Sequence, residues 1–171
     1  MNRILSALRN PVANLALAIL PATRCFALKR SLLNALGFEI AAGCKLTGGV
    51  KFYGHGRIAI GEDTWIGLGT LFIVAPDAAI VIGARCDIAP RVIFHTGSHR
   101  IGDQRRRAGV GYSLPITVAD GSWVGTGSVL LGGSSVGSAS ILAAGALLRP
   151  GDYPADTLLA GCPAIAKRVL T

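Results

Sequence analysis

The feature that most constrains the fold is a six-residue repeat, which runs without interruption through part of the second half of the chain. Each unit begins with an aliphatic residue, often has Gly or Ala second, and carries a small or β-branched residue fifth. Five consecutive units, VADGSW, VGTGSV, LLGGSS, VGSASI and LAAGAL, cover residues 118–147. A period of six is neither helical nor a simple alternation, and it predicts a short strand followed by a corner.

Earlier parts of the chain carry the same unit, because IGEDTW is followed by IGLGTL and IGARCD by IAPRVI, and residues 40–57 hold degenerate copies. We expect the aliphatic residue to point inward, the small second residue to permit a tight bend and the fifth residue to fill the corner. Stacked coils of this kind bury a continuous aliphatic ladder, which accounts for 51% hydrophobic residues but only 6% aromatic ones. The repeat therefore predicts an all-β chain, a parallel β-helix of hexapeptide repeats.

The rhythm stops at FHTGSHRIGDQRRRAGVGYSLP, which holds two of the three histidines and a run of arginines. In a solenoid, an excursion of this length projects outward and usually carries function. We predict one protruding loop over residues 95–115.

The net charge narrows the class of partner, and the spacing of the cysteines indicates the redox state of the thiols. A net charge of +8 favours an anionic partner such as a membrane surface or a phosphate-bearing cofactor or substrate. No basic stretch is interleaved with aromatic residues, so nucleic acid is not expected as a partner. The four cysteines are scattered without CxxC spacing, which is typical of reduced thiols in a cytoplasmic protein.

The N-terminal segment is basic and rich in leucine. Its apolar run over residues 12–20 is shorter than the roughly 20 residues that a membrane span needs. We predict two short amphipathic helices, broken at Pro11 and Pro21. Three roles stay open for residues 1–38: packing against the domain or a sister subunit, peripheral attachment to the inner face of an anionic membrane, and a cleaved signal.

The motifs TGSH, PITVADGSWVG, ILAAGALL and LLAGCPAIAKRV resemble those of hexapeptide-repeat acyltransferases. Over roughly residues 40–170 the chain is similar to the maltose, galactoside and polysaccharide O-acetyltransferases. The resemblance implies a left-handed parallel β-helix in a homotrimer. It also implies an amphipathic helical segment over 1–39, a β-helix acyltransferase domain over 40–153 and a CoA-binding tail over 154–171.

The activity that the resemblance implies is transfer of an acetyl group from acetyl-CoA, without a required metal, to a sugar hydroxyl of a polysaccharide or glycoconjugate precursor. His99, by its place in TGSH, matches the family's catalytic histidine. Imidazole, with an ordinary pKa of about 6.5, suits a general base near neutral pH. No Cys or Ser is placed as a covalent nucleophile, so we expect direct transfer in a ternary complex.

Four residues are candidates for contact with the acceptor. Asp77 matches an acidic position of the family, and a solvated turn residue is its alternative role. His95 either orients His99, lines the acceptor pocket or is a polar coil residue. Arg105 and Arg106, beside Asp103 at the loop tip, would bind an anionic acceptor such as a nucleotide sugar, or are simply solvated.

Six positions match places where the family contacts the CoA donor: Trp123, Thr126, Ala144, Arg149, Lys167 and Arg168. Small residues among them would let the pantetheine arm lie close to the backbone, and the basic ones would hold the 3′-phosphoadenosine end. A packing role at a coil corner is the alternative for Trp123. Gly69 and Leu71 stand where the family has a sugar-binding asparagine and its partner, which leaves the identity of the acceptor open.

Two other functions remain as alternatives. One is a trimeric zinc enzyme similar to the γ-class carbonic anhydrases, which would use His55, His95 and His99. The other is a non-enzymatic trimeric scaffold docked on membranes by the basic N-terminal segment. Metal analysis of the purified protein separates the zinc enzyme from the transferase.

Overall fold

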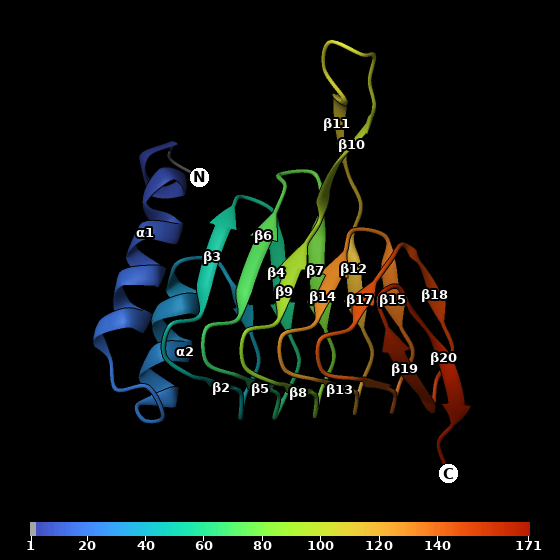
Figure 1. The fold of residues 1–171 in the computed structure, drawn as a ribbon. Helices are drawn as coiled ribbons and strands as arrows, with labels where there is room; N and C mark the ends of the chain where they lie inside the picture. Colours follow the sequence, from blue (N-terminus) through green and yellow to red (C-terminus); the bar gives the residue numbers. More distant parts are fainter. Residues whose placement is uncertain (1–2) are drawn as a thin grey trace.

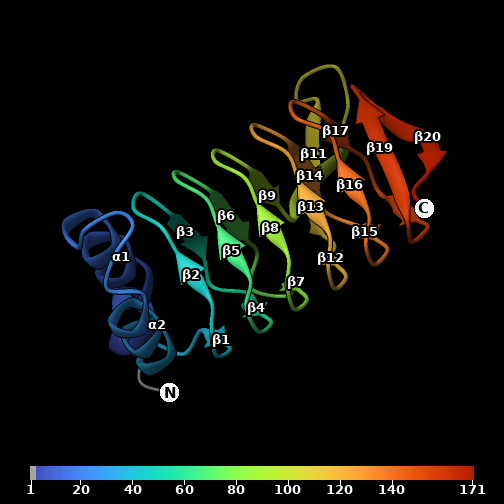
Figure 2. The same ribbon diagram turned by 90° about the horizontal axis from the view of Figure 1, so that it is seen from below.

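The computed structural model describes residues 3–171, with side chains from Leu8 onward. Helices α1 (Arg3–Ile19) and α2 (Phe26–Ala35) lie at one end of a column of stacked coils, as Figures 1 and 2 show. The chain then visits three sheets in turn, so that each round of three strands makes one of about six coils.

Within each sheet, strands from successive coils lie side by side. The first sheet holds β1 (Glu39–Ile40), β4 (Arg57–Ile60), β7 (Ala79–Ile82), β12 (Ile116–Val118), β15 (Ser134–Val136) and β18 (Gly151–Tyr153). The second holds β2 (Lys45–Leu46), β5 (Trp65–Ile66), β8 (Asp87–Ile88), β13 (Trp123–Val124), β16 (Ile141–Leu142), β19 (Thr157–Gly161) and the antiparallel β20 (Ala164–Val169). The third holds β17 (Leu147–Leu148), β14 (Val129–Leu131), β9 (Ile93–His95), β6 (Leu71–Val74) and β3 (Lys51–Gly54). A separate hairpin consists of β10 (Gly97–Ile101) and β11 (Ala108–Ser113).

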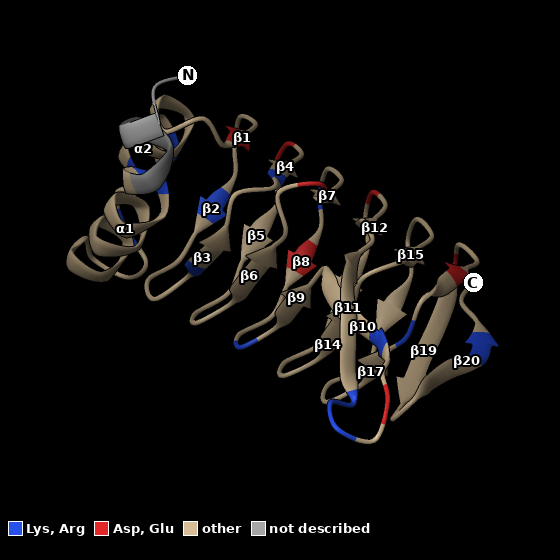
Figure 3. Cartoon of the chain, turned by 90° about the horizontal axis from the view of Figure 1, so that it is seen from above, with Lys and Arg blue, Asp and Glu red and all other residues tan. Residues whose placement is uncertain are grey.

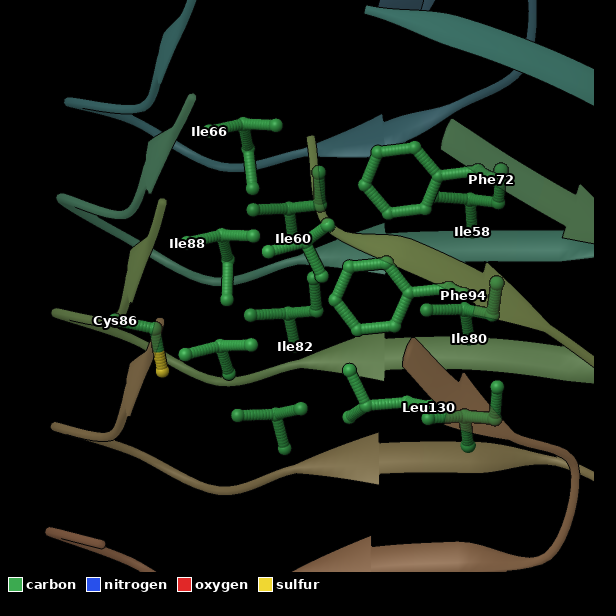
Figure 4. Close-up of a cluster of buried hydrophobic side chains, with 14 of the residues drawn as sticks. Ile58, Ile60, Ile66, Phe72, Ile80, Ile82, Cys86, Ile88, Phe94 and Leu130 are labelled. Atoms are coloured by element: carbon green, nitrogen blue, oxygen red, sulfur yellow. The ribbon is translucent and has the colours of Figure 1, made fainter. Parts of the chain in front are cut away.

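The aliphatic first residues of the repeat form ladders inside the column. Val124, for example, pairs in parallel register with Ile88 on one side and Leu142 on the other, and all three side chains are fully buried. Because neighbouring strands are about 4.8 Å apart, one residue per coil at this position gives a continuous apolar core. Figure 4 shows several of these layers. The predicted hexapeptide β-helix is confirmed.

The fifth residues fill the corners and also bond to the backbone. The Ser140 hydroxyl donates to the carbonyl of Pro154 at 3.0 Å, which joins one coil to the next. Cys44 and Cys86 occupy the same hexad position, and the Cys44 thiol donates to the Gly61 carbonyl at 2.9 Å. Both side chains are buried at this corner position, and burial raises the pKa of both thiols.

Aromatic side chains contribute more to the core than the sequence indicated. Phe38, Phe52, Phe72 and Phe94 stack along the column, with ring centroids 4.5, 5.3 and 5.1 Å apart. The Arg9 guanidinium covers the Phe38 end of this stack, 3.9 Å from the ring centroid. The expected aliphatic ladder is therefore replaced by phenylalanine at the inward positions of the third sheet in the early coils.

The helix break predicted at Pro11 is wrong, because α1 continues through it. Asn14 holds the helix to the edge strand: its amide donates to the Phe52 carbonyl at 3.0 Å and its carbonyl oxygen accepts from the Phe52 N–H at 2.8 Å. Asn10 donates to the Gly54 carbonyl of the same strand. These contacts stabilise the helix across the proline. The break at Pro21 is confirmed, since α1 ends at Ile19.

Helix α2 closes the end of the column through a buried lysine. The Lys29 ammonium group donates to the carbonyls of Pro21, Ala22 and Leu46 at 2.9, 3.0 and 3.2 Å. Three backbone acceptors that face the end of the core are thus satisfied by one side chain. Within residues 3–171, neither helix has the length and hydropathy of a membrane-crossing segment.

Candidate active site

The hairpin β10–β11 leaves the column at the corner between the third and first sheets (Figure 1). Strand β9 ends at His95 and strand β12 begins at Ile116, and the chain between them pairs Gly97 with Ser113 in an antiparallel ladder. The sequence prediction of one protruding loop is confirmed.

A hollow of about 360 Å³ lies at the base of this hairpin. It brings together three residues that the sequence singled out, Asp77, His95 and His99. Its full lining is Ala75, Asp77, His95, Gly97, Ser98, His99, Gly111, Tyr112 and Ser113. Because Asp77 follows strand β6 and the histidines lie at and after the end of β9, the stacking of two coils creates this group.

The position of the His99 ring fixes which nitrogen can act as a base. Its Nδ1 lies 3.0 Å from the carbonyl oxygen of Gly109, on the opposite strand of the hairpin. A carbonyl only accepts, so Nδ1 carries the hydrogen and Nε2 keeps its lone pair. The side chain is exposed, which leaves Nε2 free to meet a hydroxyl group.

Asp77 is held by a residue that sequence reasoning missed. The Ser113 hydroxyl donates to Asp77 Oδ1 at 2.7 Å, and both residues line the hollow with His99. The carboxylate keeps its second oxygen available to accept a hydrogen bond from a ligand. Nothing in the sequence links Ser113 to Asp77, 36 residues away, except a complete count of the coils.

The arginines of the loop tip differ in their placement. Arg106 lines a second hollow together with His99 and Asp103, whereas Arg105 lines neither hollow. Asp103 Oδ1 accepts from the backbone N–H groups of Arg105 and Arg106 at 2.9 and 3.1 Å, which shapes the turn. Figure 3 shows the resulting concentration of basic residues at the tip. Arg106 is thus the tip arginine that shares a hollow with His99.

Two of the candidate donor residues stack at a different corner, between the second and third sheets. The N–H of Gly145 donates to the Thr126 carbonyl at 2.8 Å, which sets Ala144 beside Thr126 in the next coil. Gly127 and Gly145 both have positive φ values, and a Cβ on either would meet no atom within 4 Å. The outside of this corner is therefore open, and an extended ligand can lie against its backbone.

The other donor candidates divide between two places. Trp123 lies half-exposed on β13, and Arg168 pairs with Leu158 on the same sheet, with Lys167 beside it. Arg149 follows β17 at the corner between the third and first sheets, which is the corner that bears the hairpin. The structure therefore separates Arg149 from the remaining donor candidates.

Within the described residues, no group of three or more His, Cys, Asp or Glu side chains is arranged to hold a metal ion. His55 lies in the turn between β3 and β4 and does not line the hollow that contains His95 and His99.

No family model matches the chain. Among curated proteins, galactoside O-acetyltransferase of Escherichia coli is 31% identical over 90 residues, which cover 53% of this chain and 44% of that protein. The chain spans about half or less of the length of the curated relatives it matches.

Solved structures match over most of the chain. A hexapeptide-repeat-containing acetyltransferase of Vibrio cholerae is 27% identical, with a TM-score of 0.78 over 98% of this chain and 92% of that one. The same protein has been solved in complex with acetyl coenzyme A. A galactoside acetyltransferase in complex with coenzyme A has a TM-score of 0.83 at 24% identity over 100% of this chain and 84% of that one, which supports the fold.

Proposed function

Because the chain is similar to hexapeptide-repeat acetyltransferases in sequence and in fold, we propose that it is an acetyl-CoA-dependent O-acetyltransferase that modifies a sugar hydroxyl of a polysaccharide or glycoconjugate precursor. One observation carries this proposal. His99 lies on the hairpin that projects from the column, is oriented by the Gly109 carbonyl, and lines the same hollow as Asp77.

The reaction follows from the orientation of the imidazole. Nε2 of His99 takes the proton of the acceptor hydroxyl while the hydroxyl oxygen bonds to the thioester carbonyl carbon. The C–S bond then breaks, and the imidazolium returns the proton to the departing thiolate of CoA. Asp77, held by Ser113, would accept from a second hydroxyl of the sugar and fix its orientation. Direct transfer fits the cysteines, because Cys44 and Cys86 are buried with raised pKa values and Cys25 and Cys162 lie outside the hollow.

The donor and the base come from different copies in this proposal. In one chain His99 and the open corner at Thr126 and Ala144 lie on two different edges of the column, with the third sheet between them. The hairpin also exposes Ile101 and Val110, which are 90% and 77% accessible. A homotrimer in which each hairpin reaches the Thr126 corner of its neighbour would cover these side chains and complete the site.

The test is turnover of acetyl-CoA, followed as release of free thiol, against a panel of sugars, nucleotide sugars and glycans. We expect His99→Ala to lower kcat by roughly two to four orders of magnitude while CoA binding, measured by calorimetry, is retained. His55→Ala is the matched control, because this exposed histidine lies outside the hollow, and it should keep full activity. Undiminished turnover in His99→Ala would remove the histidine from the mechanism.

A further inference from the structure

The helical cap presents an apolar face that nothing in the described part of the chain covers. The opposite face of α1 packs on β3 through fully buried side chains such as Ala13 and Leu17. Its outer face carries large apolar residues spaced by three or four positions, so they lie in one stripe. Leu8, Val12, Leu15 and Ile19 form this stripe, with exposed fractions of 50%, 38%, 61% and 72%.

Helix α2 extends the stripe into a shallow groove. Leu28, 57% exposed, and Leu32 line the groove together with the outer side of α1. The surface of this groove is apolar throughout, and its lining is Val12, Leu15, Ala16, Ile19, Leu20, Leu28 and Leu32. Apolar surface of this kind, gathered on adjacent helices, marks a contact with a partner or a membrane.

The charge around the groove selects the kind of partner. Residues 1–38 contain five basic residues and no acidic one, and the basic residues are Arg3, Arg9, Arg24, Lys29 and Arg30. The side chains of Arg9 and Lys29 are buried inside the protein, so they add no charge to the exposed face. The side chain of Arg24 is exposed and that of Arg30 is half-buried. The first acid in the chain, Glu39, is already paired with Arg57 at 2.6 Å. The cap is therefore apolar and positively charged, which suits a bilayer with anionic headgroups above its apolar interior.

We propose that α1 and α2 dock the protein on an anionic lipid bilayer, with the groove face lying in the headgroup region. A second copy of the chain is a poorer occupant, because face-to-face pairing would bring the Arg24 and Arg30 side chains of two copies together with no acid in either segment to offset them. The helices lie flat on the surface in this arrangement and do not cross it.

Flotation of the full-length protein with vesicles tests the proposal without donor or acceptor, so it is independent of the acetyltransferase activity. Wild type should float with phosphatidylcholine vesicles that contain phosphatidylglycerol, and only weakly with pure phosphatidylcholine. Leu15→Gln combined with Ile19→Gln should weaken binding about tenfold or more. Arg24→Gln should weaken binding about fivefold and lower its dependence on salt.

Val169→Gln is the matched control, because Val169 is 73% exposed on β20, at the other end of the column, and should bind like wild type. The substituted helix residues are largely exposed, so thermal unfolding should be unchanged in every variant. The proposal is overturned if anionic vesicles do not capture wild type, or if the helix variant binds as well as the control. It is also overturned if the helix substitutions lower the molar mass in solution without changing lipid binding, since the groove is then an interface between copies.

Discussion

Two corner serines in equivalent hexad positions should respond in opposite directions to removal of the hydroxyl. The single hydroxyl hydrogen of Ser128 is shared between the carbonyls of Gly125 and Ala143, which lie 2.6 and 3.0 Å from Oγ. Ser134 is equally buried, but its Oγ has no hydrogen-bond partner in the described part of the chain. The substitutions Ser128→Ala and Ser134→Ala therefore compare a satisfied hydroxyl with an unsatisfied one in the same kind of corner.

The magnitudes follow from the partners that remain. After Ser128→Ala, the Gly125 carbonyl still accepts from the Ser128 N–H and the Ala143 carbonyl from the Ala146 N–H, so only the hydroxyl bonds are lost. The free energy of unfolding should fall by about 1 kcal/mol. The Ser134 hydroxyl gives up its hydrogen bonds to water on folding and gains no partner in return. Ser134→Ala removes this cost and should raise the free energy of unfolding by about 1 kcal/mol or more.

Guanidinium denaturation and thermal melting at one protein concentration measure both effects. The two variants should differ by about 2 kcal/mol or more in the free energy of unfolding, which is roughly 4–8 °C in Tm for a chain of this size. Equal destabilisation by the two substitutions would refute the reasoning, because it would mean that the Ser134 hydroxyl is satisfied in the folded protein.

Three further predictions concern Lys29 in helix α2, Ser113 in the hollow that contains His99, and the absence of a zinc requirement. Burial lowers the pKa of the Lys29 amine below its ordinary 10.5. Between the two pKa values the unfolded chain binds more protons than the folded one, so stability rises with pH in that range. Lys29→Met should abolish this rise, measured as the denaturation midpoint at a series of pH values. Ser113→Ala frees Asp77 and should raise the acceptor KM about fivefold with little change in kcat, whereas an effect on kcat alone would contradict an orienting role. Metal analysis should find no stoichiometric zinc and a chelator should leave turnover unchanged; zinc bound one per chain and lost together with activity would favour the carbonic-anhydrase-like alternative.

The repeat predicted the fold because one hexad position points inward and another fills a corner, and both are visible in the sequence. Aliphatic residues such as Val124 and corner residues such as Ser140 lie where the pattern puts them. The continuity of α1 through Pro11 could not be predicted, because it depends on the contact of Asn14 with a strand 38 residues away. Local helix rules apply only until a tertiary contact of that kind outweighs them.

The candidate site was predictable in its parts and not in its assembly. The resemblance of TGSH to the family motif singled out His99, within the loop that interrupts the repeat, and the match to an acidic position of the family singled out Asp77. Which carbonyl orients the imidazole depends on the pairing register of the hairpin, and the Ser113–Asp77 bond depends on how two coils stack. Both are set by three-dimensional register, which the spacing of residue types along the chain does not record.

The two proposals together constrain the acceptor. The hairpin leaves the column after β9, two coils beyond β3, which is the strand that α1 packs against. At about 4.8 Å per coil, the hollow that contains His99 lies about 10 Å further along the column than the first coil. Helix α1, about 10 Å across, separates the first coil from the bilayer, so the hollow lies about 20 Å from the groove face. With the cap on a bilayer, this geometry holds the base within reach of a saccharide chain attached to a lipid and favours that acceptor over a free one. We therefore expect a lipid-linked acceptor to be acetylated faster on anionic vesicles than in detergent, and we expect the Leu15→Gln, Ile19→Gln variant to lose this advantage while it keeps its rate on soluble acceptors.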